Sequence, residues 1–416
     1  MKKSLLLLMA VCFYSLSGIG QISGLKSIPG DYSSVAAAIS ALNASGVGTG
    51  GVTFNVAAGH SETFANLTDG LISATGTQAN PVIFQKSGAG NNPLITAATP
   101  GTGAIDYIIC FEGGDYFTFD GIDIQDNPAN NTATQQMEFG FALRKALITL
   151  VTDGAQHNTL KNCTISLKTN ENAFGISLES KTPAGSNVSV SALSGTNSYN
   201  KFYSITFNNC YGGISLNGYN DASPFALFDQ ANEIGVGGGN FFTYSGLQGA
   251  SNNSMGIYAT YQNDLEIANN NFSGSVEMPV NVRYYAARLI DAENANLNIY
   301  NNKITMACSG AGYFNGFVID GMGKNGTNNT LNFYDNQIVN NSFLTHQGGN
   351  VNYAYINTGA VNANCYNNEI TGNSIGSNTA NSTGSVTYLY FSSLPSVVSN
   401  SVMNCHNNTV SNNTRS

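Results

Sequence analysis

A short pattern that returns at long intervals constrains the fold of this chain more than any other sequence feature. Each copy centres on an asparagine, with an apolar residue or cysteine three positions earlier and an isoleucine, valine or phenylalanine two positions later. The five anchors, which are 32, 34, 32 and 40 residues apart, are Asn270, Asn302, Asn336, Asn368 and Asn408. A fixed motif at such a period is typical of stacked units that cannot bury their apolar faces alone.

Short strand-like runs lie between the anchors, as at 213–216, 256–259 and 316–319, and give each unit two or three strands. These runs lack the Asn-Gly turns that join close hairpin partners. Propeller blades are an alternative, but they usually hold four strands in about 40 to 45 residues. We therefore expect an all-β chain wound as a parallel coil, with the anchors above one another and bonded amide to amide.

The N-terminal region predicts a leader and a cap. Two lysines precede an apolar run at 5–11, and small residues follow, as in a secretory signal peptide cut before Gln21. That run is too short to act as a transmembrane anchor. Ser33 or Ser34 can cap a helix over 33–42 that closes the first end of the stack. The expected organisation is a signal peptide at 1–20, an N-terminal cap at 21–104 and β-helix repeats at 105–416.

Residues 31–59 resemble the helix, strand and glycine turn that open right-handed parallel β-helices of the pectin-lyase-like family. The run 119–122, Phe-Asp-Gly-Ile, and the asparagine repeats resemble the coils of that family. The same features resemble large surface proteins of Bacteroidetes-type bacteria, many exported by the type IX system. The resemblance covers nearly all of 25–410 and implies a right-handed parallel β-helix that is secreted or held on the outer cell surface. Since the last anchor lies close to Ser416, we expect the natural chain to continue.

The charge balance argues against some partners. The formal net charge is −9 and only 9% of residues are charged. An acidic chain with scattered basic residues does not predict binding to nucleic acid or to an anionic membrane. The spacing of cysteine and histidine predicts no zinc site. We expect no cofactor, with Ca²⁺ as the alternative discussed below, and the oligomeric state is not predicted.

The richest mixed cluster of the chain suggests catalytic residues. Lyases of the resembled family abstract a proton with lysine or arginine. By that resemblance, the base is Arg283 or Arg288, the acid Tyr284 or Tyr285, and the cation ligands Asp291 and Glu293. The favoured alternative is an exposed coil face with surface ion pairs that contribute little. The Gly-His-Gly and Arg-x-Lys motifs of galacturonan hydrolases are absent from the sequence.

Two further groups have a structural and a functional interpretation. Asp120, Asp123 and Asp126 have the densest acidic spacing and suggest a Ca²⁺ site, although turn chemistry explains them more simply. The outer tyrosines at one motif position predict stacking in successive coils, and they form either a glycan-binding face or simple cross-strand packing. These tyrosines are Tyr300, Tyr334 and Tyr366.

Two functions follow from these observations. The first is a non-catalytic secreted or cell-surface β-helix that acts in adhesion or contacts a polysaccharide or cell-surface glycan. The second is a polysaccharide lyase or glycoside hydrolase acting on an acidic polysaccharide. A lyase requires a groove in which an arginine faces at least two carboxylates.

Overall fold

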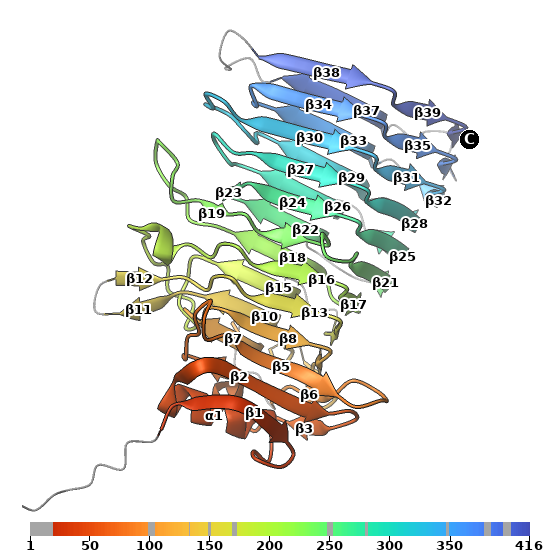
Figure 1. Cartoon of the computed structure of the whole chain (residues 1–416). Helices are drawn as coiled ribbons and strands as arrows, with labels where there is room; N and C mark the ends of the chain where they lie inside the picture. The colour runs from red at the N-terminus through yellow and green to blue at the C-terminus, as the bar shows by residue number, and fades with distance from the viewer. Residues whose placement is uncertain are drawn as a thin grey trace, which may run out of the picture.

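The backbone winds through three parallel sheets, here named A, B and C, and the predicted parallel β-helix is confirmed (Figure 1). The computed structural model describes residues 20–98, 105–132, 134–148, 151–168, 173–247, 253–278, 282–346, 349–377, 384–393 and 401–416. Each complete coil runs from sheet A to B to C, with one strand in sheet A, one or two in sheet B and one in sheet C. None of the helices in these ranges is long and apolar enough to cross a membrane.

The strands of each sheet follow one another in chain order. Sheet A contains β1 (Ile22–Ile28), β2 (Val47–Ala57), β5 (Val82–Ser87), β8 (Phe117–Asp120), β13 (Thr159–Lys161), β16 (Lys201–Tyr203), β20 (Glu233–Ile234), β24 (Leu265–Ala268), β27 (Leu297–Tyr300), β30 (Thr330–Tyr334), β34 (Asn362–Tyr366) and β38 (Val402–His406). Sheet B contains β3 (Ser61–Thr63), β6 (Leu94–Thr96), β9 (Asp123–Gln125), β14 (Thr164–Ser166), β17 (Thr206–Asn208), β21 (Phe241–Leu247), β25 (Asn271–Met278), β28 (Lys303–Gly310), β31 (Gln337–Val339), β35 (Glu369–Thr371) and β39 (Thr409–Ser411), with β32 (Ser342–His346), β36 (Ser374–Ser377) and β40 (Thr414–Arg415) beside them. Sheet C contains β4 (Leu71–Ile72), β7 (Tyr107–Glu112), β10 (Phe139–Arg144), β15 (Phe174–Glu179), β18 (Gly212–Asn217), β22 (Ser254–Thr260), β26 (Arg283–Ile290), β29 (Tyr313–Asp320), β33 (Val351–Thr358) and β37 (Val386–Ser393).

A few elements lie outside the three sheets. An antiparallel hairpin, β11 (Ala146–Ile148) and β12 (Val151–Asp153), projects from the stack (Figure 1). A short parallel pair forms from β19 (Asp229–Gln230) and β23 (Gln262–Asn263). Two short 3-10 helices are η1 (Leu67–Gly70) and η2 (Leu193–Gly195).

Helix α1 (Val35–Ser45) covers the first end of the stack, as predicted, with bounds slightly later than 33–42. Ser34 is the N-cap and its hydroxyl accepts from the Ala37 N–H at 3.0 Å. The Glu62 carboxylate accepts from the Val35 N–H at 2.7 Å and so satisfies another free donor of the first turn. One face of the helix is buried on the coil interior, as Val35, Ala38, Ile39 and Leu42 show.

The sheets continue without a break through the expected boundary between cap and repeats, because β2, β5 and β8 pair in succession. Strand β1, which the sequence analysis missed, forms the first edge of sheet A. The predicted signal peptide lies outside the described residues, apart from Gly20.

Stacked rings fill the interior of the coil. In sheet A, the ring centroids of Phe54 and Phe84 are 4.5 Å apart. In sheet B, Phe207 and Phe242 are 4.7 Å apart, and the stack continues at 4.6 Å to Phe272. Glycines of sheet C face this second stack and leave room for the rings, since a Cβ at Gly175 would lie 2.5 Å from the Phe207 ring.

The predicted asparagine ladder is present at the turn from sheet A to sheet B. Each Nδ2 donates to the Oδ1 of the next anchor, at 2.9 Å from Asn270 to Asn302 and at 3.0 Å from Asn302 to Asn336. The ladder continues at 3.1 Å to Asn368 and at 2.8 Å to Asn408. The same oxygens accept backbone N–H groups, so the buried turns are satisfied along the axis.

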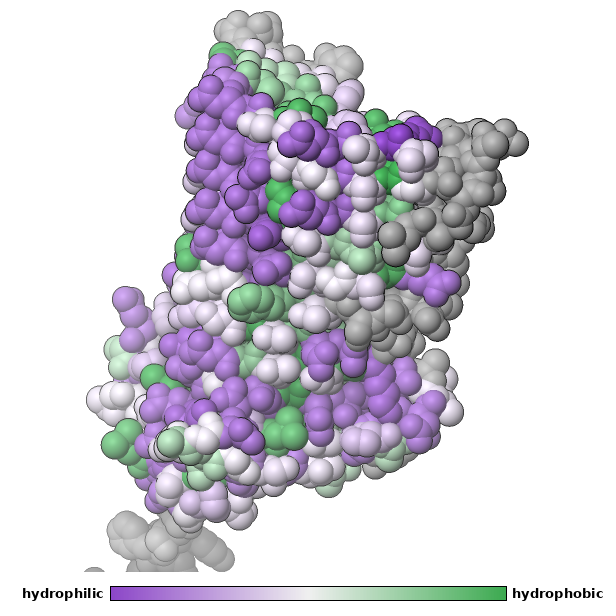
Figure 2. All heavy atoms as spheres, turned by 90° about the vertical axis from the view of Figure 1, so that its right-hand side faces the viewer, coloured by the Kyte–Doolittle hydropathy of each residue, from purple (hydrophilic) through white to green (hydrophobic). Residues whose placement is uncertain are grey.

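The residue before each anchor explains the Asn-Asn pairs of the sequence. Asn301, Asp335 and Asn367 have φ of 55°, 53° and 55°, a left-handed conformation that asparagine and aspartate tolerate best after glycine. Their exposed side chains line the turn from sheet A to sheet B. Figure 2 shows a continuous hydrophilic band along the left edge of the upper coils, where these turns lie.

Candidate functional site

The outer face of sheet C carries a pocket of about 300 Å³ in the upper coils. Strands β26, β29 and β33 supply its walls, and its lining includes Arg283, Tyr285, Tyr313, Asn315, Asp320, Asn352 and Tyr355. We call this surface, together with the adjoining Arg288 and Tyr258, the arginine face.

Strand register brings these side chains together. Tyr285 pairs with Asn315, and Asn315 pairs with Asn352 on the next coil. Arg283 pairs with Tyr313 in the same way. Residues that are about 30 positions apart in the chain thus become neighbours at the spacing of adjacent strands, about 4.8 Å.

Both arginines lie over tyrosine rings. The Arg283 guanidinium carbon is 4.9 Å from the centroid of Tyr313. The guanidinium carbon of Arg288 is 5.4 Å from the Tyr285 centroid and 5.9 Å from that of Tyr258. Cation–π contact at these distances orients a guanidinium and leaves its N–H groups available to another acceptor.

The charges of Arg283 and Arg288 are unpaired within the described residues. No carboxylate oxygen there lies within 4.0 Å of a guanidinium nitrogen of either residue. By contrast, a guanidinium nitrogen of Arg144 lies 3.5 Å from a carboxylate oxygen of Glu179. Asp320 is the single carboxylate among the described residues that line the pocket, and it accepts from the Asn357 amide at 2.9 Å. The arginine face therefore offers guanidinium donors in excess over carboxylates.

The structure corrects part of the predicted catalytic cluster. Tyr284 is fully buried, stacked on Phe314 at 5.7 Å, so it faces the interior and cannot meet a ligand on the arginine face. Asp291 and Glu293 follow β26 in a loop, and neither is among the residues that line the pocket. Arg283, Arg288 and Tyr285 are brought together, but without the two facing carboxylates that a lyase site requires.

The predicted tyrosine stack is present on the outer face of sheet A. The centroids of Tyr300 and Tyr334 are 5.0 Å apart, as are those of Tyr334 and Tyr366, with the rings nearly parallel. The Tyr300 hydroxyl donates to Glu266 at 2.6 Å. Since the rings cover one another's faces, only their edges remain for a sugar.

The three aspartates suggested as a Ca²⁺ site do not converge. Asp120 pairs with Lys161 at 3.1 Å, and Asp123 accepts from the Thr164 N–H at 2.7 Å. Asp126 is buried and accepts from the Asn130 amide at 2.8 Å. Across the described ranges, no group of three or more His, Cys, Asp or Glu side chains is placed to hold a metal ion.

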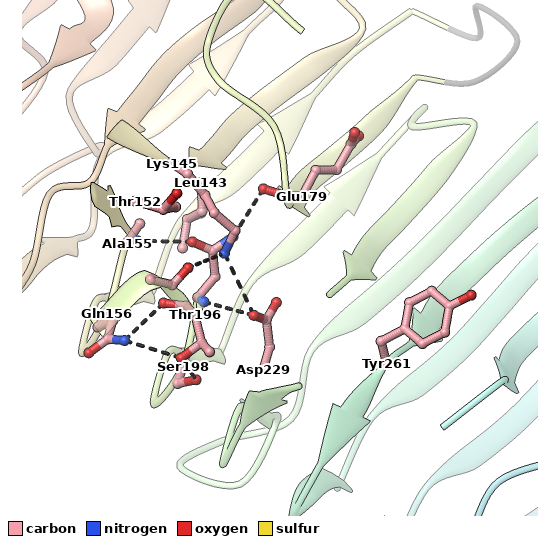
Figure 3. Close-up of polar contacts among 12 residues, drawn as sticks. Leu143, Lys145, Thr152, Ala155, Gln156, Glu179, Thr196, Ser198, Asp229 and Tyr261 are labelled. Carbon is pink, nitrogen blue, oxygen red and sulfur yellow. Dashed lines mark hydrogen bonds and ion pairs between the residues drawn. The ribbon is translucent and has the colours of Figure 1, made fainter. Parts of the chain in front are cut away.

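The sequence did not predict a buried polar network that lies where the chain passes from sheet C to sheet A in the lower coils (Figure 3). Lys145 is fully buried, and its Nζ donates to the Gly195 carbonyl at 2.7 Å and lies 3.8 Å from Asp229. Asn197 accepts from the Ala155 N–H at 2.9 Å and donates its own N–H to Asp229 at 2.8 Å. Burial lowers the pKa of Lys145 and raises that of Asp229, although each charge offsets part of this effect on the other.

Comparison with known proteins shows no family for this chain. No family model and no curated protein sequence matches this chain. A GH136 lacto-N-biosidase from Eubacterium ramulus is similar in structure, with 12% identity and a TM-score of 0.46 over 91% of this chain and 64% of that chain. The A-module of the mannuronan C-5 epimerase AlgE6 from Azotobacter vinelandii has 12% identity and a TM-score of 0.29, over 91% and 98% of the two chains. The match spans 64% of the length of the lacto-N-biosidase chain.

Proposed function

We propose that this protein binds an anionic polysaccharide on the arginine face, where the carboxylate or sulfate groups of the sugars accept from Arg283 and Arg288. The observation that carries this proposal is that both guanidiniums are unpaired among the described residues. Guanidinium donates two parallel hydrogen bonds to a carboxylate, which is the strongest polar contact available at a partly exposed surface.

The rest of the arginine face suits a sugar chain. Tyr285 and Tyr355 lie beside the arginines and offer apolar area. The amides of Asn315 and Asn352 are bonded to each other at 2.9 Å, and Asn315 also donates to the Tyr284 carbonyl. The protein carries a formal net charge of −9, so its overall field repels a polyanion and attraction must come from these local contacts. A polysaccharide ligand agrees with the secreted or outer-surface location that the N-terminal sequence predicts.

Lyase activity is the second candidate. It is favoured by the contact between Arg288 and Tyr285, a base and an acid 5.4 Å apart measured from guanidinium carbon to ring centroid. It is disfavoured by the single carboxylate, Asp320, among the described residues of the pocket lining. We therefore rank binding first.

The test is calorimetric titration of the mature protein with polygalacturonate, alginate and heparin. At least one of these polyanions should bind, and the Arg283→Gln/Arg288→Gln variant should bind it about 100-fold more weakly or worse, because one lost charged hydrogen bond from each arginine removes about 3–6 kcal/mol. Lys303→Gln, which removes an exposed charge from sheet B, is the matched control and should bind like the wild type.

Failure of all three polyanions to bind, or equal binding by the arginine variant, would overturn the proposal. Absorbance of the unsaturated product, followed in the same mixtures, separates the second candidate. Steady turnover that is lost in Tyr285→Phe would assign lyase activity to the arginine face.

A further inference from the structure

A second pocket, of about 410 Å³, lies where β15 and β18 of sheet C end. Its walls come from segments that leave the coil after these strands, around Asn187 and Asn220, and from Tyr261 at the next turn. A volume of this size is within the range of sites that hold small ligands. No sequence motif pointed to this pocket.

Three asparagine side chains in this pocket have no partner. Within the described residues, the amide groups of Asn187, Asn217 and Asn220 neither donate nor accept a hydrogen bond. Each amide supplies two donors and an acceptor with two lone pairs. This differs from the anchors of the ladder, such as Asn302, whose amide is fully engaged. The pocket therefore presents a concentrated, unused set of neutral donors and acceptors.

The charges beside the pocket cancel. The one charged residue in its lining, among the residues described, is Lys181, whose Nζ lies 2.6 Å from Glu179. Burial tends to raise the pKa of Glu179, but Arg144 and Lys181 lower it on balance, so this carboxylate stays ionised and neutralises Lys181. A free anion would find no unpaired cation here, in contrast to the arginine face.

The buried network of Figure 3 fixes the walls of this pocket. The Asn197 amide donates to the Glu179 carbonyl at 3.1 Å, just before the chain leaves the coil. The Thr152 hydroxyl donates to the Ser189 carbonyl at 2.7 Å and holds the far wall. A site whose walls are held in this way loses little conformational entropy when a ligand binds.

We propose that this pocket is a second binding site, for an uncharged sugar unit. The unpartnered amides would bind sugar hydroxyls, and Tyr219 and Tyr261 would supply the apolar contact area. The site lies on the same sheet as the arginine face, since Asn217, Thr260, Ile290 and Asp320 pair in succession. Three strand spacings, roughly 14 Å, separate this pocket from the arginine face. Binding of a free neutral sugar here does not depend on the function proposed for the arginine face.

The test uses four neutral probes, the tetrasaccharides of the cello-, manno-, galacto- and chito- series, titrated into the mature protein by calorimetry. At least one should bind the wild type. Asn187→Ala/Asn217→Ala should weaken that binding about tenfold or more, because two sets of amide hydrogen bonds are lost. Asn298→Ala, on the outer face of sheet A, is the matched control. Circular dichroism and the melting temperature establish that each variant is folded.

The arginine variant Arg283→Gln/Arg288→Gln separates the two sites, since it should keep the wild-type affinity for the neutral tetrasaccharide. Binding of none of the four probes would overturn the inference. Unchanged binding by the folded double asparagine variant, or loss of neutral-sugar binding in the arginine variant, would overturn it as well.

Discussion

At the scale of single residues, the anchors of the ladder each make several hydrogen bonds. Asn302 donates to the Ile267 and Tyr300 carbonyls and to Asn336, while its Oδ1 accepts twice from Asn270. Removing such a group leaves buried donors and acceptors without partners, which costs more than the bond itself contributes.

Asn302→Leu should therefore lower the free energy of unfolding by about 2–4 kcal/mol, because it leaves the Asn270 backbone N–H and one amide hydrogen of Asn270 without an acceptor in the interior. Chemical denaturation followed by circular dichroism measures the change. Asn298→Ala is the control, since Asn298 lies on the outer face and accepts one bond, from Asn332 at 2.7 Å. Equal losses in the two variants would contradict the role assigned to the buried ladder.

Asp115 gives a pH-dependent prediction. Burial raises the pKa of this carboxyl to about 7, although the hydrogen bond that it accepts from the Gln156 N–H lowers the pKa in part. Because the folded pKa is above the unfolded value, this group costs stability as pH rises from about 4 to about 7 and the cost is complete above that range. The free energy of unfolding of Asp115→Asn relative to wild type should therefore rise by about 2–4 kcal/mol from about pH 4 to about pH 8. The difference of roughly three pH units between the folded and unfolded pKa corresponds to about 4 kcal/mol at about 1.36 kcal/mol per unit, and the partial exposure of the side chain reduces it.

Unfolding by urea at the two pH values measures this difference. Asp335→Asn, which replaces an exposed carboxylate, is the matched control. A stability difference between wild type and Asp115→Asn that does not vary with pH would rule out a raised pKa at Asp115.

At the scale of elements, the glycines of sheet C set how closely it approaches sheet B. Gly175→Ala should destabilise the protein by about 1–3 kcal/mol, since the new Cβ would overlap the Phe207 ring, and Phe207→Leu in the same chain should recover part of this loss. A double-mutant cycle of unfolding free energies measures the coupling. Strict additivity would show that the glycine serves another purpose.

The buried pair that supports the second pocket is also an element-scale feature. Lys145→Met should cost about 3–5 kcal/mol, because it leaves the buried Asp229 carboxyl without its cation and the Gly195 carbonyl without its donor, whereas Lys145→Met/Asp229→Asn should be markedly less destabilised. Thermal and urea unfolding measure both variants. A double variant at least as unstable as the single one would contradict an ion pair at this position.

At the scale of the whole molecule, the repeat predicted the coil because one residue type, asparagine, recurs at a nearly constant period and so aligns each coil with the next. The ladder from Asn270 to Asn408 and the tyrosine stack follow directly from that alignment. The sequence did not show in the same way which side chains of sheet C face the solvent and which face the interior. In β26 simple alternation from the exposed Arg283 turns Tyr284 inward, but Ala286 and Ala287 are both buried, so the alternation breaks before Arg288.

The pockets were harder to predict for a related reason. The arginine face combines residues of three coils, and only the register shows that Asn315 and Asn352 lie beside Tyr285. The second pocket depends on loops whose lengths differ from coil to coil, so no period marks it. In the sequence, the mixed cluster that includes Arg283 and Arg288 was the signal that pointed to a site.

The most direct test of anionic-glycan binding follows the arginine side chains themselves. The chain has four arginines, so the Nε–Hε signals of Arg144, Arg283, Arg288 and Arg415 can be assigned by substitution and followed by NMR during titration with oligogalacturonate. The signals of Arg283 and Arg288 should shift with saturation, while that of the buried Arg144 stays in place. Unmoved signals from Arg283 and Arg288, or a uniform drift of all four, would contradict a binding site on the arginine face.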